Sequence, residues 1–426
     1  MKLAVLLLAS SLSGLVTDHL NAPAGSEAEA QALAEIRVWW EKDPTVVVEA
    51  VRNRVVFPAA KPGLSITKIR LRSLPKDKDA PDRNEVAIRV PKGYDPAKKH
   101  PLFLLVHGTG GFADAEAKQL GPLADKYGFL LVAPQDELKR AGGGWGYTDY
   151  EFEMHRAAVL WAKKNYNVDD RRVFVSGGSR GGHAAWALAA TWPHVFAGAV
   201  PIVGGPRNHF FRYLPNLRHV PVFDMQGAKD QPGLVENVRD AVALLREWKY
   251  DVRYEEDAES GHYYPVDWEV VREWAKGRAR PGHPKHVTLV TSRNDRARAY
   301  WIRLAGLDER KFAKVKPPVN RSSKPLTRAE MQGLVRDNYA KYAARVDATV
   351  EGNVIDLAVV KAPRVIVSLA PGLVDLGQKV IITVNGRPRE RRVFKPDLET
   401  MLRRVKETGD RDLLYPVEVE VRGTSR

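Results

Sequence analysis

Three residue types that together turn a hydroxyl group into a nucleophile occur at separate places in this sequence. Ser179 lies within GGSRG, residues 177–181, which is a Gly-x-Ser-x-Gly pattern. A serine hydroxyl reacts readily only when a base takes its proton, and that base needs a third group to orient it. His262 is the candidate base and Asp230 is the candidate orienting acid. The sequence therefore predicts a nucleophilic serine site.

The serine lies in a sharp turn between a predicted strand and a predicted helix. Residues 173–175 are apolar and β-branched or aromatic, whereas residues 184–190 are rich in Ala and Leu. Gly177 and Gly181 leave room for the turn, which lifts the Ser179 hydroxyl above the sheet. The N–H groups that begin the helix would stabilise an oxyanion there. The alternative is a glycine-rich turn without chemistry.

The candidate acid and base each follow another predicted strand. Asp230 comes after the strand predicted at 220–225, and His262 comes after the one predicted at 252–255. We expect both side chains at the sheet edge that carries Ser179, because they follow the carboxyl ends of their strands. The chain order serine, aspartate, histidine is also the one that accompanies this type of turn.

Other acids and histidines compete for these roles. Asp224 would lie within a strand, and Asp257 is close to His262 in the sequence, so both are weaker candidates for the orienting acid than Asp230. His183 follows the serine by one helical turn, which favours a packed residue over a second base. His107, at the end of a predicted strand, is expected to hold the following loop by hydrogen bonds.

Strands and helices alternate through the middle of the chain, which predicts a mainly parallel sheet with helices on both faces. The first two strands are expected to form an antiparallel edge. The predicted strands are 66–71, 86–90, 101–106, 129–132, 173–175, 197–203, 220–225 and 252–255. The predicted helices are 26–41, 113–127, 150–164, 184–190, 233–249 and 266–276.

The pattern changes near residues 281–284, PGHP, after which short β-type runs dominate. The dipeptide at 385–386, Asn-Gly, predicts a tight hairpin turn, although Pro388 limits the strand that follows it. A separate β-rich domain is therefore expected. Its predicted strands are 287–291, 299–304, 344–350, 354–360, 365–369, 380–384 and 417–421.

Composition indicates a globular protein of two or three domains, with 426 residues, 44% hydrophobic and 28% charged. The absence of cysteine excludes disulfides, thiolate metal sites and a cysteine nucleophile. His283 and His286 fit no metal-binding spacing, so no metal is expected.

The net charge of +15 is spread along the chain, and its densest cluster, 387–392, is interrupted by an acid. This favours a solvated basic surface over a nucleic-acid site.

The N-terminus is typical of a secretory signal peptide. Lys2 precedes the apolar run 3–8, and residues 22–24 form an Ala-x-Ala cleavage site. The apolar run is too short to span a membrane, so we expect a secreted or periplasmic protein without stable membrane insertion. The alternative is an amphipathic helix that stays attached, which Asp18 and His19 support.

A rival motif lies between residues 108 and 113, GTGGFA. It satisfies Gly-x-Gly-x-x-Ala and is followed by Asp136, as in a dinucleotide-binding fingerprint. An exported protein has little access to nicotinamide cofactors, and this interpretation leaves the Ser179 turn unexplained. No organic cofactor is therefore expected.

These motifs together make the chain resemble the alpha/beta-hydrolases, in particular the secreted esterases and polyhydroxybutyrate-depolymerase-like proteins (phospholipase/carboxylesterase type). The resemblance covers about residues 85–278. It is carried by His107-Gly108, by 177–182, by the Gly-x-x-Asp of 227–230, by Gly261-His262, and by Val168-Asp169 with Arg172-Val173.

The resemblance implies that Ser179 is the nucleophile, His262 the base and Asp230 the orienting acid. It also implies an oxyanion hole made by the backbone N–H of Arg180 and by one in the glycine-rich loop, for which we name Thr109. The Arg180 side chain departs from the commonest form of the motif. It could draw acidic substrates at the pocket mouth or point into solvent, and the sequence leaves both open.

We therefore expect an alpha/beta-hydrolase fold followed by a β-rich domain. The expected parts are a signal peptide (1–24), an N-terminal helical extension (25–62), a catalytic domain (63–278) and the β-rich C-terminal domain (279–426).

The expected function is a secreted serine hydrolase that cleaves carboxylic esters through an acyl-enzyme. The substrate is an ester, with polysaccharide esters and polyesters as polymeric candidates, and Trp145 and Tyr147 are candidates for the substrate pocket. A peptidase of the same fold and an inactive, polymer-binding protein are the alternatives. The oligomeric state, the acyl and alcohol parts of the substrate and the role of the β-rich domain stay open.

Overall fold

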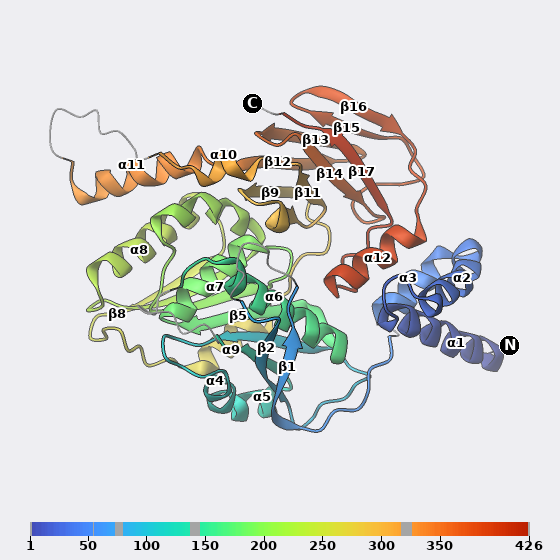
Figure 1. Cartoon of the computed structure of the whole chain (residues 1–426), viewed down its shortest axis with the longest axis horizontal. Helices are drawn as coiled ribbons and strands as arrows, with labels where there is room; N and C mark the ends of the chain where they lie inside the picture. Colours follow the sequence, from blue (N-terminus) through green and yellow to red (C-terminus); the bar gives the residue numbers. More distant parts are fainter. Residues whose placement is uncertain (1, 54, 73–79, 137–144, 317–325, 425–426) are drawn as a thin grey trace.

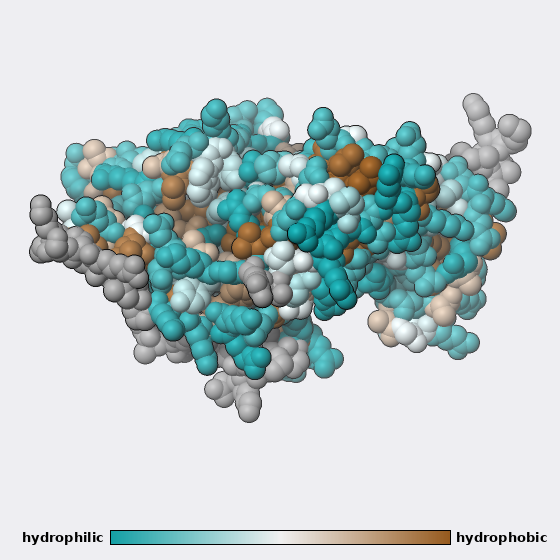
Figure 2. Space-filling view, turned by 90° about the horizontal axis from the view of Figure 1, so that it is seen from above, coloured by the Kyte–Doolittle hydropathy of each residue, from teal (hydrophilic) through white to brown (hydrophobic). Residues whose placement is uncertain are grey.

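The computed structural model describes residues 2–53, 55–72, 80–136, 145–316 and 326–424. Figure 1 shows an α/β domain with one large sheet, a β-rich part beside it, and three N-terminal helices packed at one end. Figure 2 shows hydrophilic side chains over most of one face, with hydrophobic residues in small groups.

The large sheet has eight strands in the order β1-β2-β4-β3-β5-β6-β7-β8. β1 and β2 pair antiparallel, β2 pairs antiparallel with β4, and the remaining pairs are parallel. The predicted antiparallel edge and mainly parallel sheet are thus confirmed. The strands are β1 (Gly63–Arg70), β2 (Arg83–Val90), β3 (His100–Val106), β4 (Leu130–Pro134), β5 (Val168–Gly178), β6 (Gly198–Ile202), β7 (Val222–Gly227) and β8 (Val252–Asp257).

Helices cover both faces of this sheet. Leu102 and Leu104 of β3 belong to the core under α6, α7 and α8, whereas Phe103 and Leu105 belong to the core under α4, α5 and α9. The predicted helix 113–127 is two helices, because Pro122 has no N–H with which to continue the first one. The helices are α4 (Ala113–Gln119), α5 (Gly121–Tyr127), α6 (Asp149–Asn165), α7 (Arg180–Thr191), α8 (Pro232–Glu247) and α9 (Trp268–Lys276), with the 3-10 helix η1 (Asn208–His219).

The β-rich part consists of two sheets, β16-β15-β13-β12-β9 and β10-β11-β14-β17, whose inward residues form one core. The strand predicted at 299–304 is instead a tight hairpin, because the chain turns at Tyr300 with φ 50°. Opposite Pro388 the register of β15 and β16 shifts. The elements are β9 (His286–Thr291), η2 (Asn294–Arg296), β10 (Arg298–Ala299), β11 (Ile302–Ala305), α10 (Glu309–Ala313), α11 (Arg328–Ala340), β12 (Ala344–Glu351), β13 (Val354–Val360), β14 (Arg364–Leu369), β15 (Val380–Val384), β16 (Arg387–Arg392), α12 (Leu398–Thr408) and β17 (Val417–Arg422).

Three helices precede the large sheet: α1 (Lys2–Asn21), α2 (Glu27–Lys42) and α3 (Pro44–Asn53). Leu12 and Val16 of α1 are buried in a small core that also contains Met401 of α12. The signal peptide predicted at 1–24 contains α1, and its cleavage stays a prediction. Among the described helices, none is both long enough and apolar enough to cross a membrane.

A buried ion cluster joins the α/β domain to the β-rich part. The Arg280 guanidinium donates to the Asp410 carboxylate over 2.9 Å and to the backbone carbonyl of Asp170 over 3.1 Å. Lys163 pairs with Asp170 over 2.9 Å. Although burial opposes it, Arg280 and Lys163 hold the pKa of Asp410 below its ordinary value. The boundary predicted at 278–279 therefore lies next to a buried junction.

Candidate active site

Ser179 is held in a strained backbone conformation between β5 and α7. Its φ and ψ are 56° and −115°, a region that L residues rarely adopt. A Cβ atom at Gly177 would lie 2.3 Å from the carbonyl oxygen of Val106, and one at Gly181 would lie 1.9 Å from the same oxygen. The end of β3 therefore approaches this turn so closely that both flanking positions require glycine.

The structure brings together the three residues that the sequence singled out. Ser179 Oγ lies 2.7 Å from His262 Nε2, and His262 Nδ1 lies 2.9 Å from Asp230 Oδ2. Because a carboxylate only accepts, Nδ1–H donates to Asp230, which leaves Nε2 to accept from the serine hydroxyl. Asp230 is buried, whereas the His262 side chain is 44% exposed. The arrangement can move a proton from Ser179 to His262.

Asp230 is positioned at the end of β7 by hydrogen bonds of its own. Gln226 Nε2 donates to its Oδ2 over 3.0 Å, and the backbone N–H of Gln231 donates to its Oδ1 over 2.7 Å. A Cβ atom at Gly227 would lie 2.1 Å from the carbonyl oxygen of Gly261. Glycine at 227 thus lets the loop that carries His262 pass directly over the end of β7.

The competing acids and the second histidine bond elsewhere. Asp224 accepts from Trp186 Nε1 over 2.8 Å, and complete burial raises its pKa to about 8. Asp257 accepts from the backbone N–H of Glu259 and from Ser260. His183 Nδ1–H donates to the carbonyl of Gly205, as expected of a packed residue.

The glycine-rich loop after β3 lies beside the serine. A Cβ atom at Gly108 would lie 3.8 Å from Ser179 Cβ. His107 holds this loop as expected, since its Nδ1–H donates to the Gly108 carbonyl over 2.8 Å and its Nε2 accepts from the backbone N–H of Asp136 over 3.1 Å. Burial lowers the pKa of His107, which keeps its ring neutral. Thr109 follows and is exposed, and its role as an oxyanion donor stays a prediction.

Neither sequence-based expectation for the Arg180 side chain is correct. It is buried, donates to Glu151 Oε1 over 2.9 Å and pairs with Asp136. Its guanidinium also lies 5.6 Å from the ring centre of Trp145. Asp136 is therefore engaged with Arg180, which removes the acid that the dinucleotide interpretation needs.

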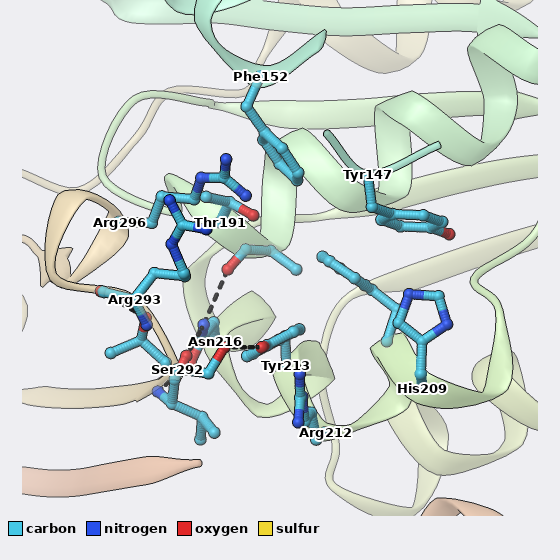
Figure 3. Close-up of a pocket in the computed structure, with 14 residues that line it drawn as sticks. Tyr147, Phe152, Thr191, His209, Arg212, Tyr213, Asn216, Ser292, Arg293 and Arg296 are labelled. Atoms are coloured by element: carbon cyan, nitrogen blue, oxygen red, sulfur yellow. Dashed lines mark hydrogen bonds between the residues drawn. The ribbon is translucent and has the colours of Figure 1, made fainter. Parts of the chain in front are cut away.

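The pocket expectation for Trp145 is also wrong, because this residue is completely buried beneath Arg180. The Tyr147 ring contacts Trp145 edge-on at 6.0 Å and His209 edge-on at 4.7 Å, and Figure 3 shows it beside His209. There it lines a cavity of about 230 Å3 between η1 and β9. Neither Ser179 nor His262 lines that cavity.

Glu151 is a site-supporting residue that sequence reasoning missed. Besides Arg180, its carboxylate accepts from the backbone N–H groups of Gly146 and Thr148, each over 2.9 Å. Thr148-x-x-Glu151 is a capping box that begins α6, and this pattern was readable in the sequence. The partnership with Arg180 was not, because it joins residues 29 positions apart.

Two exposed aromatic residues stand next to the predicted site residues. Phe112 ends the glycine-rich loop and is 65% exposed, and Tyr263 follows His262 and is 93% exposed. Sequence reasoning missed both.

Among the described residues, no group of three or more His, Asp or Glu side chains could hold a metal ion.

A serine at a strained strand-to-helix turn, bonded to a histidine and through it to an aspartate at the edge of this eight-stranded sheet, defines an alpha/beta-hydrolase. Residues 79–275 match the family model described as "Putative esterase". The domain that carries Ser179 is thus related to that esterase family.

Individual relatives agree with this assignment. Acetylxylan esterase A of Aspergillus oryzae is 28% identical over 143 residues, 31% of this chain and 45% of the relative. Feruloyl esterase B of Neurospora crassa is 35% identical over 115 residues, 24% of this chain and 39% of the relative. This chain spans less than half the length of the curated relatives it matches. The solved structure of an acetyl xylan esterase from Aspergillus awamori covers 50% of this chain and 99% of its own, with 16% identity and a TM-score of 0.41.

Proposed function

We propose that this protein is a serine carboxylic ester hydrolase that acts through an acyl-enzyme. The observation that carries the proposal is the pair of hydrogen bonds from Ser179 through His262 to Asp230. Ser179 Oγ attacks the ester carbonyl carbon while His262 Nε2 takes the hydroxyl proton. His262 then gives that proton to the leaving alcohol, and the acyl group stays on the serine.

The second half of the reaction uses the same groups. His262 takes a proton from water, the resulting hydroxide attacks the acyl carbon, and Ser179 leaves with the proton that His262 returns. In both halves of the reaction the carbonyl oxygen of the substrate acquires negative charge. We propose that the backbone N–H groups of Arg180 and Thr109 donate hydrogen bonds to this oxygen. Arg180 supports this role because it is the first residue of α7, where N–H groups have no acceptor within the helix.

We further propose that the substrate ester belongs to a polymer met outside the cell. Relatives are named for acetylxylan, feruloyl esters and poly(3-hydroxyalkanoate). The exposed rings of Phe112 and Tyr263 flank the proposed oxyanion loop and base, where they can lie against a sugar ring or a polyester chain. The N-terminal segment supports export, as its apolar run and Ala-x-Ala site are those of a signal peptide.

The test compares an ester and an anilide of the same acyl group, together with fluorophosphonate labelling. We expect kcat/KM to favour the ester by several decades and the label to attach to Ser179. Ser179→Ala should abolish both, at a cost on the order of 10⁶ in kcat, whereas Ser65→Ala on the exposed edge strand β1 should leave both unchanged. Comparable anilide turnover would favour a peptidase. Absence of labelling would favour an inactive, polymer-binding protein.

A further inference from the structure

A second cavity lies at the junction of the α/β domain and the β-rich part. Its volume is about 290 Å3, close to the lower end of the range for small-molecule sites. It is lined by α6, by the segment after α7, by the β10–β11 hairpin and by the end of α12. None of Ser179, Asp230 and His262 lines it, so it is separate from the proposed catalytic centre.

Positive charge dominates the wall of this cavity. Its cationic side chains are Arg72, Arg156, Lys163, Arg296, Arg298 and Arg303, against the carboxylates of Asp295 and Glu407. Four of the cations have carboxylate partners within 3 Å. Arg72 and Arg156 pair with Glu153, Lys163 with Asp170, and Arg296 with Asp149. The remaining two are Arg298 and Arg303.

Arg298 and Arg303 lie directly opposite each other on β10 and β11. Like charges in that position repel, and among the residues that the structure describes neither guanidinium has an ion-pair partner. Arg298 Nη1 and Arg303 Nε are buried and donate to no acceptor among those residues. Burial, together with the positive charges of Arg404 and Arg303, lowers the pKa of Arg298 to about 9, although the carboxylates of Glu418 and Glu407 oppose this shift. The two side chains are half-buried, and a further negative charge between their guanidiniums would offset this repulsion.

The other residues that line the cavity indicate what kind of molecule would supply that negative charge. The Nδ1 atom of His194 and the Nε atom of Arg296 are also buried and make no hydrogen bond within the described part of the chain. Apolar side chains, among them Val159 and Phe196, also line the cavity. The cavity thus offers guanidinium N–H donors together with hydrophobic surface.

We propose that this cavity binds a small organic molecule carrying a carboxylate or phosphate group, whose oxygens accept hydrogen bonds from Arg298 and Arg303. The two guanidiniums share one oxyanion, which converts their repulsion into a joint attraction. The carbon skeleton lies against Val159 and Phe196. Because the site contacts both parts of the protein, its ligand stabilises their junction. The proposal does not depend on the catalytic role of Ser179.

The test is calorimetric titration and thermal unfolding of the full chain with three probes at constant ionic strength: inorganic phosphate, glucose 6-phosphate and glucuronate. We expect saturable binding and a rise in Tm with at least one probe. Equal responses to phosphate and glucose 6-phosphate would mean that the oxyanion alone is recognised. A stronger response to the sugar derivatives would mean that the apolar wall also contributes, and the glucuronate arm separates a carboxylate from a phosphate.

Substitutions locate the site. The double variant Arg298→Gln/Arg303→Gln should weaken binding at least tenfold, and the milder variant Arg303→Gln alone should weaken it measurably with circular dichroism unchanged. Arg387→Gln/Arg391→Gln removes the same charge from the exposed strand β16 and should bind like the original protein. The proposal is overturned if no probe binds, or if the Arg298→Gln/Arg303→Gln variant binds as well as the control.

Discussion

The guanidinium of Arg180 donates to the carboxylate of Glu151 over 2.9 Å. Arg180 is the residue directly after the proposed nucleophile, Ser179. Glu151 lies in the first turn of α6, and Asp136, which also pairs with Arg180, follows β4. One buried side chain therefore ties the turn at Ser179 to two other loops at the same edge of the sheet. The backbone N–H proposed to bind the oxyanion belongs to the same residue.

Arg180→Met should destabilise the protein strongly. It breaks the buried pair of Arg180 with Glu151 and the pair with Asp136; breaking a buried pair costs about 3–5 kcal/mol. Urea unfolding measures this loss. Arg310→Met removes an exposed cation paired with Asp308 and should cost at most about 1 kcal/mol. Equal effects of the two substitutions would contradict the structural role of Arg180.

Gly181→Ala should destabilise the turn and remove esterase activity. Its new Cβ would lie 1.9 Å from the Val106 carbonyl oxygen, so the end of β3 must move, at a cost of about 1–3 kcal/mol or more. Gly178 is the matched control, because a Cβ there meets nothing within 4 Å. Thermal unfolding and ester turnover check both variants, and full activity of Gly181→Ala would refute the steric argument.

Asp230→Asn should lower kcat by roughly 10⁴, by analogy with the same change in a known serine triad. The amide cannot hold the His262 tautomer in which Nε2 is free to accept the serine proton. Asp257→Asn changes a carboxylate of the neighbouring loop that bonds Glu259 and Ser260, and should keep nearly full kcat. The reverse ranking in steady-state kinetics would show that the acid has been misassigned.

Asp224 should make stability fall as pH rises. Its pKa is about 8 in the folded protein against 3.8 for the free side chain, so between these values the folded state binds more protons than the unfolded state. The free energy of unfolding then decreases with pH across this window, with a slope that corresponds to a difference of about one bound proton between the two states. Asp224→Asn still accepts from Trp186 and should flatten the profile. Chemical unfolding from pH 4 to 8 measures it, and an identical slope in both proteins would exclude the effect.

Phe112→Ser with Tyr263→Ser should reduce turnover of polymeric esters selectively. If each ring contributes about 1 kcal/mol of contact with the polymer, kcat/KM on acetylated xylan or a polyester film falls by about tenfold or more. A short aryl ester is expected to reach Ser179 without contacting the two rings, so its hydrolysis should be unchanged. A parallel loss on both substrates would mean that the rings support the loops instead of the polymer.

Local patterns were enough to predict the sheet and the three site residues. The strands of the α/β domain show as apolar runs bounded by turns, and a strand, a Gly-x-Ser-x-Gly turn and a helix must place Ser179 at the carboxyl edge. Asp230 and His262 follow strands of the same sheet, so they arrive at the same edge. These inferences use the neighbours of each residue in the sequence, the chain order of the three residues and the resemblance to the alpha/beta-hydrolases.

Features that depend on contacts between distant segments were not predictable in this way. Arg180 is buried against Glu151 and Asp136, and Trp145 packs against Phe152 and His155 of α6. These groups come together only once α6 and β4 are in place. The run 299–304 has strand-like composition, yet the chain turns at Tyr300. β11 then pairs with β10 in the same hairpin and with β14 on its other side. The opposed pair Arg298 and Arg303 follows from that turn, so the second cavity was hidden for the same reason.

The contact between α1 and α12 has a consequence for biosynthesis. Met401, which helps to bury Leu12 and Val16, is synthesised several hundred residues after both of them. At about 5–20 residues per second, the interval is on the order of tens of seconds. Throughout it, the apolar side of the first helices has no access to its final neighbour and is open to chaperones or to the export machinery. The small core around Leu12 and Val16 therefore cannot be completed until α12 has been synthesised.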